Sequence, residues 1–210
     1  MSDIIRISAP LDAETARSLR AGQRVLLSGV IYTARDAAHR RLCELLDAGG
    51  EPPFPLEGAV IYYCGPAAAP PGRPIGSAGP TTSYRMDSYA PKLIALGLRG
   101  MIGKGPRSQP VADAMREHGA VYLAATGGAG ALLAGCVEEC EVIAWDDLGA
   151  EAVRRLTVRD MPLTCAQDAA GGDLYRSGPE DYIRTAFGCG CLRPARREGD
   201  AGTDVPATHF

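Results

Sequence analysis

Short apolar runs alternate along this chain with segments that favour helices, and this alternation restricts the possible folds more than any other feature. The runs rich in β-branched and aromatic residues are RVLLSGVIYTA (24–34), AVIYYC (59–64), RGMI (99–102), VYLAAT (121–126), VEECEVIAWDD (137–147) and PLTCAQD (162–168). Amphipathic segments separate them and end at glycines, as residues 36–48 end at Gly49. Such alternation is typical of an α/β fold with an at least partly parallel sheet.

The expected elements form one domain that is followed by a tail. Besides residues 36–48, we expect helices over residues 11–19, 82–96 and 108–117, and one helical turn over residues 149–156. From about Gly188 the composition turns to Gly, Arg, Asp, Pro and Thr, which cannot build a packed core. We therefore predict a single domain over residues 1–188 and a mobile C-terminal tail over residues 189–210.

Charge and composition exclude several functional classes. The formal net charge of −3 gives no reason to expect binding to nucleic acid or to a membrane surface. The sequence contains no run of about 18 apolar residues, so we expect no membrane span. The N-terminal MSDIIRISAPLDAET lacks the basic region of a secretory signal, so we expect a cytoplasmic protein. The seven cysteines include no C-x-x-C pair and no Cys/His pair at zinc-finger spacing, so we expect no metal site in this chain.

The stretch GSAGPTTSYRMD (76–87) is the strongest candidate for a binding site. Thr82 or Ser83 is a suitable helix cap, but capping needs only one hydroxyl and explains neither Thr81 nor Arg85. A cation in the first turn of a helix opposes the helix dipole unless an anion lies nearby. A carboxylate bound by Thr81, Thr82 and Arg85 would satisfy all of these groups.

Two further segments carry cations at positions where a strand is expected to end. Lys104 stands between two glycines in GKG, where the backbone comes close to a ligand and the ammonium meets an anion; the alternative is a solvated lysine in a turn. Arg35, Asp36 and His39 follow the first long strand in TARDAAH, at the edge that faces the ligand in parallel α/β folds. There the alternative is a capping Asp36, a surface Arg35 and a packed His39.

Together, two arginines, one lysine and paired hydroxyls suit a small dicarboxylate, because a guanidinium binds a carboxylate through two hydrogen bonds. The sequence lacks a metal-ligand set, a nucleotide loop and a Ser-His-Asp arrangement. It therefore indicates half of an active site.

The same segments carry a resemblance to a known family. GRPIGSAGPTTSYRMDSYAPKLIALGLRGMIGKG (72–105) resembles the β region of iron–sulfur hydro-lyases, the class I fumarases and L(+)-tartrate dehydratases. Supporting segments are LSGVIYTARDAAHRRL (27–42), GAVIYYCGP (58–66), GAVYLAATGGAGALL (119–133), DDLGAEAVRRLTVRDMP (146–162) and DLY (173–175). The resemblance covers about residues 5–185 and implies a swivelling β/β/α-type domain.

The resemblance also implies a reaction, a cofactor and a partner. Members of this family add or remove water across the double bond of a small dicarboxylate. Their α part holds a [4Fe–4S] cluster through three cysteines, so we expect this chain to be a separate β subunit that binds no cluster and works with an α subunit, in an α2β2-type assembly. We favour fumarate hydration to L-malate; the alternatives are L(+)-tartrate dehydration and a stand-alone dicarboxylate-binding module.

Site roles follow from the same resemblance. Thr81 resembles the hydroxyl that acts as base, with its pKa lowered by Arg85 and Lys104. Substrate carboxylates would contact Arg35, Thr82, Arg85 and Lys104, and catalysis is assigned to Thr81, Arg85 and Lys104. The remaining matched residues, Asp36 and His39, receive supporting roles.

Overall fold

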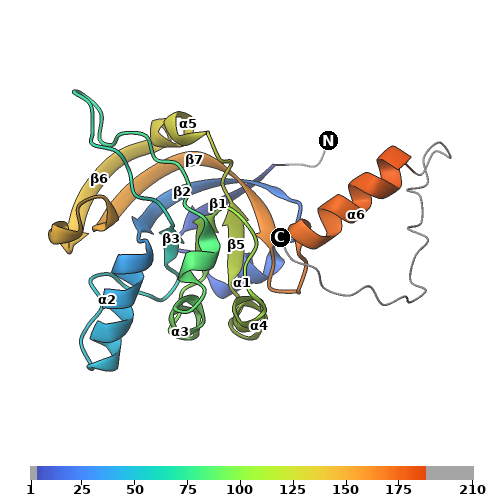
Figure 1. The fold of residues 1–210 in the computed structure, drawn as a ribbon, viewed down its shortest axis with the longest axis horizontal. Helices are drawn as coiled ribbons and strands as arrows, with labels where there is room; N and C mark the ends of the chain where they lie inside the picture. The colour runs from blue at the N-terminus through green and yellow to red at the C-terminus, as the bar shows by residue number, and fades with distance from the viewer. Residues whose placement is uncertain (1–3, 188–210) are drawn as a thin grey trace, which may run out of the picture. The chain divides into compact units, whose positions relative to one another are not determined.

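The computed structural model describes residues 4–187, which form an α/β domain and a terminal helix (Figure 1). The strands are β1 (Ile5–Ala9), β2 (Arg24–Thr33), β3 (Val60–Tyr62), β4 (Gly100–Gly103), β5 (Val121–Ala124), β6 (Val137–Ala144) and β7 (Val153–Gln167). The α-helices are α1 (Ala13–Ser18), α2 (Asp36–Asp47), α3 (Ala90–Ala95), α4 (Gln109–His118), α5 (Gly130–Gly135) and α6 (Leu174–Phe187). Two 3₁₀ segments, η1 (Ser83–Met86) and η2 (Asp146–Glu151), complete the described elements.

The sheet has seven strands, of which the first five run parallel. Its order is β1-β2-β3-β4-β5-β7-β6, and β2 also pairs antiparallel with β7 along most of its length. Since β7 pairs with β5 as well, the strands β2, β3, β4, β5 and β7 form a closed circuit of hydrogen bonds. The predicted α/β class with a partly parallel sheet is confirmed.

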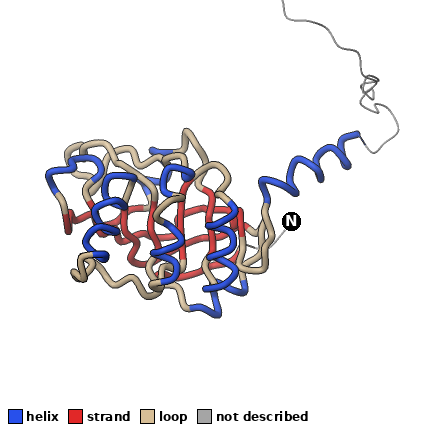
Figure 2. Tube along the Cα trace, turned by 60° about the horizontal axis from the view of Figure 1, so that its bottom comes forward, coloured by secondary structure: helices blue, strands red, loops and turns tan. Residues whose placement is uncertain are grey.

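Strands β3, β4 and β5 form a middle layer that is buried on both faces. Val60 and Tyr62 of β3 face one apolar core, which they share with β1, β2 and β7, while Ile61 faces a second core beneath the helices. Figures 1 and 2 show α2, α3 and α4 across one side of the sheet. The layers are therefore sheet, sheet and helix, and double burial explains why these short strands read as continuous apolar runs.

Local signals account for most of the element bounds. Asp12 caps α1 by accepting a hydrogen bond from the backbone N–H of Thr15 at 2.6 Å, as its sequence position predicts. Gly119 ends α4 in the left-handed conformation, with φ at 74°. The signals at residues 11–19 and 108–117 were therefore sufficient to predict these two helices.

Three expectations differ from the structure. The strand β1 was not predicted, because Arg6 and Ser8 interrupt its apolar residues and leave no continuous apolar run. The helical turn expected at 149–156 is wrong beyond residue 151, since β7 already begins at Val153 and pairs with both β2 and β6 there. The continuous helix expected over 82–96 is also wrong: it is divided into η1 and α3, because Pro91 near the start of α3 has no N–H to continue a helix from η1.

The chain divides into two units, residues 1–175 and 176–210. In the second unit the described part belongs to α6, which contains Pro179. The predicted tail over 189–210, with Cys189 and Cys191, lies outside the described residues. No helix in the described part of the chain has the length and apolar character needed to cross a membrane.

Candidate functional site

The segment that contains the two threonines is fixed to the carboxyl ends of β3 and β4. The backbone N–H of Thr81 donates to the carbonyl of Tyr63 at 2.7 Å, and the N–H of Ser83 donates to the carbonyl of Lys104 at 2.9 Å. Thr82 and Lys104 form a parallel bridge. These backbone bonds place Lys104 beside Thr81 and Thr82, although more than 20 residues separate it from the two threonines in sequence.

A buried hydrogen-bond chain supports this segment from below. Ser83 is fully buried, its hydroxyl lies 2.8 Å from the hydroxyl of Tyr122, and that phenol donates to the carbonyl of Gly105 at 2.9 Å. Gly103 is required here, because a Cβ at this position would lie 2.0 Å from the Ser83 hydroxyl oxygen. The close approach of strand β4 to Ser83 therefore depends on a missing side chain.

The two threonine hydroxyls do not cap a helix. Thr82 is the residue before η1, but its side chain makes no capping hydrogen bond. The four-residue η1 also offers too short a dipole for the anion site that a long helix would provide. Within the described part of the chain, the hydroxyls of Thr81 and Thr82 remain free for another partner.

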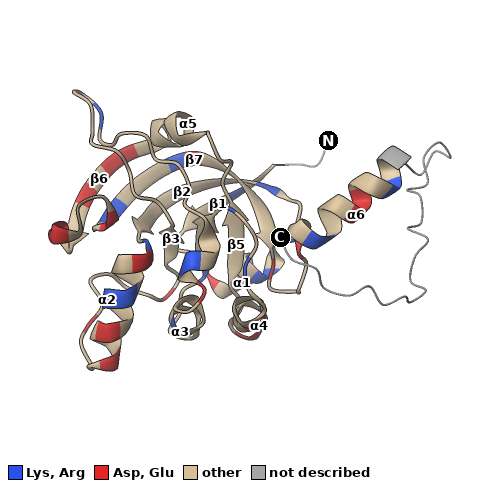
Figure 3. Ribbon diagram, in the orientation of Figure 1, with Lys and Arg blue, Asp and Glu red and all other residues tan. Residues whose placement is uncertain are grey.

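Two arginines and two carboxylates form a line beside this segment. Arg85 donates to the Asp36 carboxylate at 3.0 Å, and Arg35 lies 3.8 Å from the other oxygen of Asp36. The Glu151 carboxylate lies 3.1 Å from Nη2 of the Arg35 guanidinium. Because Arg85 belongs to η1 and Asp36 begins α2, this ion pair joins the threonine segment to the helix that follows β2. Figure 3 shows one basic stretch of α2 between acidic residues nearer its two ends.

Lys104 is the unpaired cation of the site among the described residues. Within residues 4–187 its ammonium has no ion-pair or hydrogen-bond partner, whereas both arginines have carboxylate partners. It extends past Gly127, where a Cβ would lie 3.9 Å from the ammonium nitrogen. An unpaired ammonium beside two free hydroxyls has the chemistry to bind an anionic group.

His39 is buried beneath the site and is neutral at physiological pH. Its Nδ1 lies 2.9 Å from the carbonyl of Arg35, and because a carbonyl only accepts, Nδ1 carries the proton. Burial lowers the pKa of His39 to about 4, and its ring packs edge-on against Tyr63. The structure thus places His39 behind Arg35, where it holds the backbone and does not face solvent.

The sequence interpretation missed a buried ion pair that joins the two sides of the site. The side chain of Arg107 is fully buried; its Nε donates to Asp87 at 2.7 Å, and the second oxygen of Asp87 accepts from the backbone N–H of Ser108 at 2.7 Å. The guanidinium also lies over the rings of Tyr63 and Tyr122. Arg107 follows a Gly-Pro turn, so nothing in its sequence context distinguishes it from an exposed arginine.

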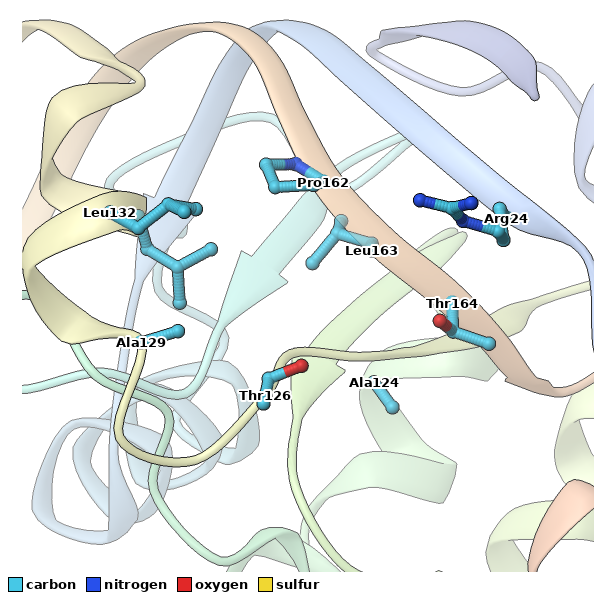
Figure 4. Close-up of a pocket in the computed structure, with 9 residues that line it drawn as sticks. Arg24, Ala124, Thr126, Ala129, Leu132, Pro162, Leu163 and Thr164 are labelled. Carbon is cyan, nitrogen blue, oxygen red and sulfur yellow. The ribbon is translucent and has the colours of Figure 1, made fainter.

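Asp36 and Glu151 line a cavity of about 310 Å³ together with Ala37, Arg40 and Tyr89. A second cavity of about 300 Å³ lies beside α5 and the end of β5, where Thr126, Leu132 and Pro162 approach one another (Figure 4). The predicted site residues do not line this second cavity. Of these two cavities, the polar one beside α2 therefore adjoins the candidate site.

The cysteines of the described chain do not fit an iron–sulfur cluster. Burial raises the pKa of Cys64 and of Cys165 to about 12, and it also raises the pKa values of Cys43, Cys136 and Cys140. Cluster ligands are thiolates, which these environments disfavour. Residues 4–187 also contain no group of three or more His, Cys, Asp or Glu side chains placed to hold a metal.

The α/β domain carries cations and hydroxyls at one edge, and comparison with known proteins gives its family. Residues 2–178 match the family model described as Fumarase C-terminus, and the chain belongs to this family. It is 44% identical over 155 residues to the anaerobic class I fumarate hydratase of Escherichia coli K12, which covers 73% of this chain and 28% of that enzyme. It is 40% identical over 156 residues to fumarate hydratase 2 of Leishmania major, covering 73% of this chain and 28% of that protein.

A relative of similar length carries a different name. The putative L(+)-tartrate dehydratase subunit beta of Methanocaldococcus jannaschii is 37% identical over 171 residues, which cover 79% of this chain and 88% of that protein. By contrast, the chain spans only about 28% of the length of the two fumarate hydratases. The resemblance to class I fumarases and L(+)-tartrate dehydratases is thus confirmed.

Proposed function

We propose that this chain is the β subunit of a class I-type hydro-lyase and contributes half of an active site that interconverts fumarate and L-malate. The observation that carries the proposal is the fixed placement of Thr81 and Thr82 beside Lys104, with Arg85 on the same short segment. Cations and hydroxyls at one edge suit a substrate with two carboxylates.

The proposal gives each residue a role. Arg35, Arg85 and Lys104 bind the substrate carboxylates, and Thr82 adds a hydroxyl contact. Thr81 removes the proton from the substrate carbon, since the neighbouring Lys104 ammonium favours the ionised form of its hydroxyl. Asp36 and His39 support these groups by holding Arg85 and the backbone of Arg35.

The proposal assigns the [4Fe–4S] cluster to a separate α-type chain, because the described cysteines do not suit one. We infer an α2β2-type assembly in the cytoplasm. The length match with the tartrate dehydratase subunit supports the two-chain arrangement.

The same match favours L(+)-tartrate dehydration to oxaloacetate as the second candidate function. Its substrate is also a dicarboxylate and carries one more hydroxyl than malate. The cationic groups of this chain suit either substrate, so the choice between them falls to groups on the partner.

Anaerobic co-expression with an α-type chain, followed by assays with fumarate and with L(+)-tartrate, tests the proposal. We expect turnover of fumarate only when both chains are present, and faster than turnover of tartrate. Preferential turnover of tartrate would replace the first candidate with the second. If no turnover occurs while the chain alone binds L-malate, the chain is a dicarboxylate-binding module instead.

A further inference from the structure

Glu151 uses both oxygens of its carboxylate at the start of α2. One oxygen lies 3.1 Å from Nη2 of Arg35, and the other accepts a hydrogen bond from the backbone N–H of Ala37 at 3.1 Å. Arg35 precedes α2 without capping the helix through its own side chain. Glu151 therefore supplies this helix start with a carboxylate from a distant segment and binds the preceding arginine at the same time.

The segment η2 is shaped so that it presents Glu151 to Arg35. Gly149 interrupts it with φ at 58° and ψ at −113°, a conformation that side chains rarely adopt. Arg154 donates to the carbonyls of Gly149, Ala150 and Ala152 at 2.8–3.2 Å, which fixes the turn on both sides of Glu151. The carboxylate is thus offered by a rigid turn.

The Arg35 guanidinium has a second carboxylate close enough to compete for it. Its Nε lies 3.8 Å from Asp36, is buried and makes no hydrogen bond, and the neighbouring Asp36 oxygen is equally unpartnered. A small shift would let Arg35 close onto Asp36. Glu151 already occupies Nη2, which lies on the same edge of the guanidinium as Nε. It therefore opposes this closure and leaves the other Asp36 oxygen to Arg85.

We propose that Glu151 is a positioning residue for substrate binding: it holds the Arg35 guanidinium away from Asp36, so that both arginines keep donors free for a substrate carboxylate. This inference rests on the proposed function for its effect on catalysis. Glu151 itself does not contact the substrate, so its loss weakens binding and leaves proton transfer by Thr81 largely intact.

Kinetics of the assembled enzyme test this role with Glu151→Gln, which removes the charge at constant size. We expect KM for the dicarboxylate to rise about tenfold while kcat changes less than about threefold. Glu151→Asp should restore most of the affinity because it keeps the charge. The matched control is Asp147→Asn, on the same segment and paired with Arg41 of the same helix, but exposed; it should leave KM unchanged. A KM for Glu151→Gln equal to that of Asp147→Asn would overturn the proposal.

A second readout does not depend on activity. In the full chain, side-chain NMR of arginine should show slow rotation of the Arg35 guanidinium, assigned by the loss of its signals in Arg35→Lys. Glu151→Gln should make this rotation fast, whereas Asp147→Asn should not. Slow rotation that persists in Glu151→Gln refutes the positioning role even if the assembled protein has no hydro-lyase activity, and the absence of wild-type turnover refutes only the proposed function.

Discussion

Replacement of Asp87 by asparagine should destabilise the domain strongly, because it breaks the buried pair with Arg107. The Asp87 side chain is 13% exposed and that of Arg107 is 0% exposed, so the remaining guanidinium would lose its only carboxylate partner in the described chain. Breaking a buried ion pair costs about 3–5 kcal/mol. Asparagine keeps one acceptor oxygen for Arg107 or Ser108, so we expect a loss at the lower end, about 3 kcal/mol.

For a domain of this size, a loss of about 3 kcal/mol lowers Tm by about 6–12 °C. Thermal and urea unfolding of the isolated chain, followed by circular dichroism, measure the change. Asp113→Asn is the matched control, since the Asp113–Arg116 pair is exposed, and its Tm should stay at the wild-type value. A loss below about 1 kcal/mol for Asp87→Asn would refute the claim that this pair fastens the segment over 81–87 to the turn after Lys104.

Three further predictions address the site and its support. Burial lowers the pKa of His39 from 6.5 to about 4, so the unfolded chain binds more protons than the folded chain between these pH values. The free energy of unfolding should therefore fall by about 3 kcal/mol as pH falls through this window. His39→Gln should reduce this pH dependence, and urea midpoints with the same pH profile in the variant and the wild type would contradict the prediction. Gly103→Ala should cost about 1–3 kcal/mol because its Cβ overlaps the Ser83 hydroxyl, whereas Gly127→Ala, with no atom closer than 3.8 Å, should unfold at the wild-type temperature. Arg85→Ala should cost about 2–4 kcal/mol in kcat/KM of the assembled enzyme, and unchanged KM and kcat would remove Arg85 from the substrate site.

The sequence was sufficient to predict the fold class and most strands, since β3, β4 and β5 are short apolar runs between glycines. It was misleading where long-range pairing decides the structure. β7 begins in VRRLTVRD, the first part of which was expected to belong to a helical turn. It is a strand because both of its edges are paired, one with β2 and the other with β6.

The sequence indicates residues for the candidate site but not the contacts among them. In the GPTTS and GKG segments, the hydroxyls and the cation next to glycines indicate a binding site. The contacts of Arg107 and Glu151 were not predictable, because each residue pairs with partners far away in the sequence. Burial of Arg107 and the pairing of Glu151 with Arg35 arise only when β4, α2 and η2 come together.

The assignment of Thr81 as the base is the central claim, and the neighbouring Thr82 provides its direct test. In the assembled enzyme, initial rates should be measured over a range of substrate concentrations up to saturation for Thr81→Val and for Thr82→Val. Both threonines are partly exposed, and each exchange replaces a hydroxyl by a methyl group of similar size. We expect Thr81→Val to lose most of kcat without loss of assembly, and Thr82→Val to change mainly KM. Turnover of Thr81→Val at the wild-type rate would contradict the assignment.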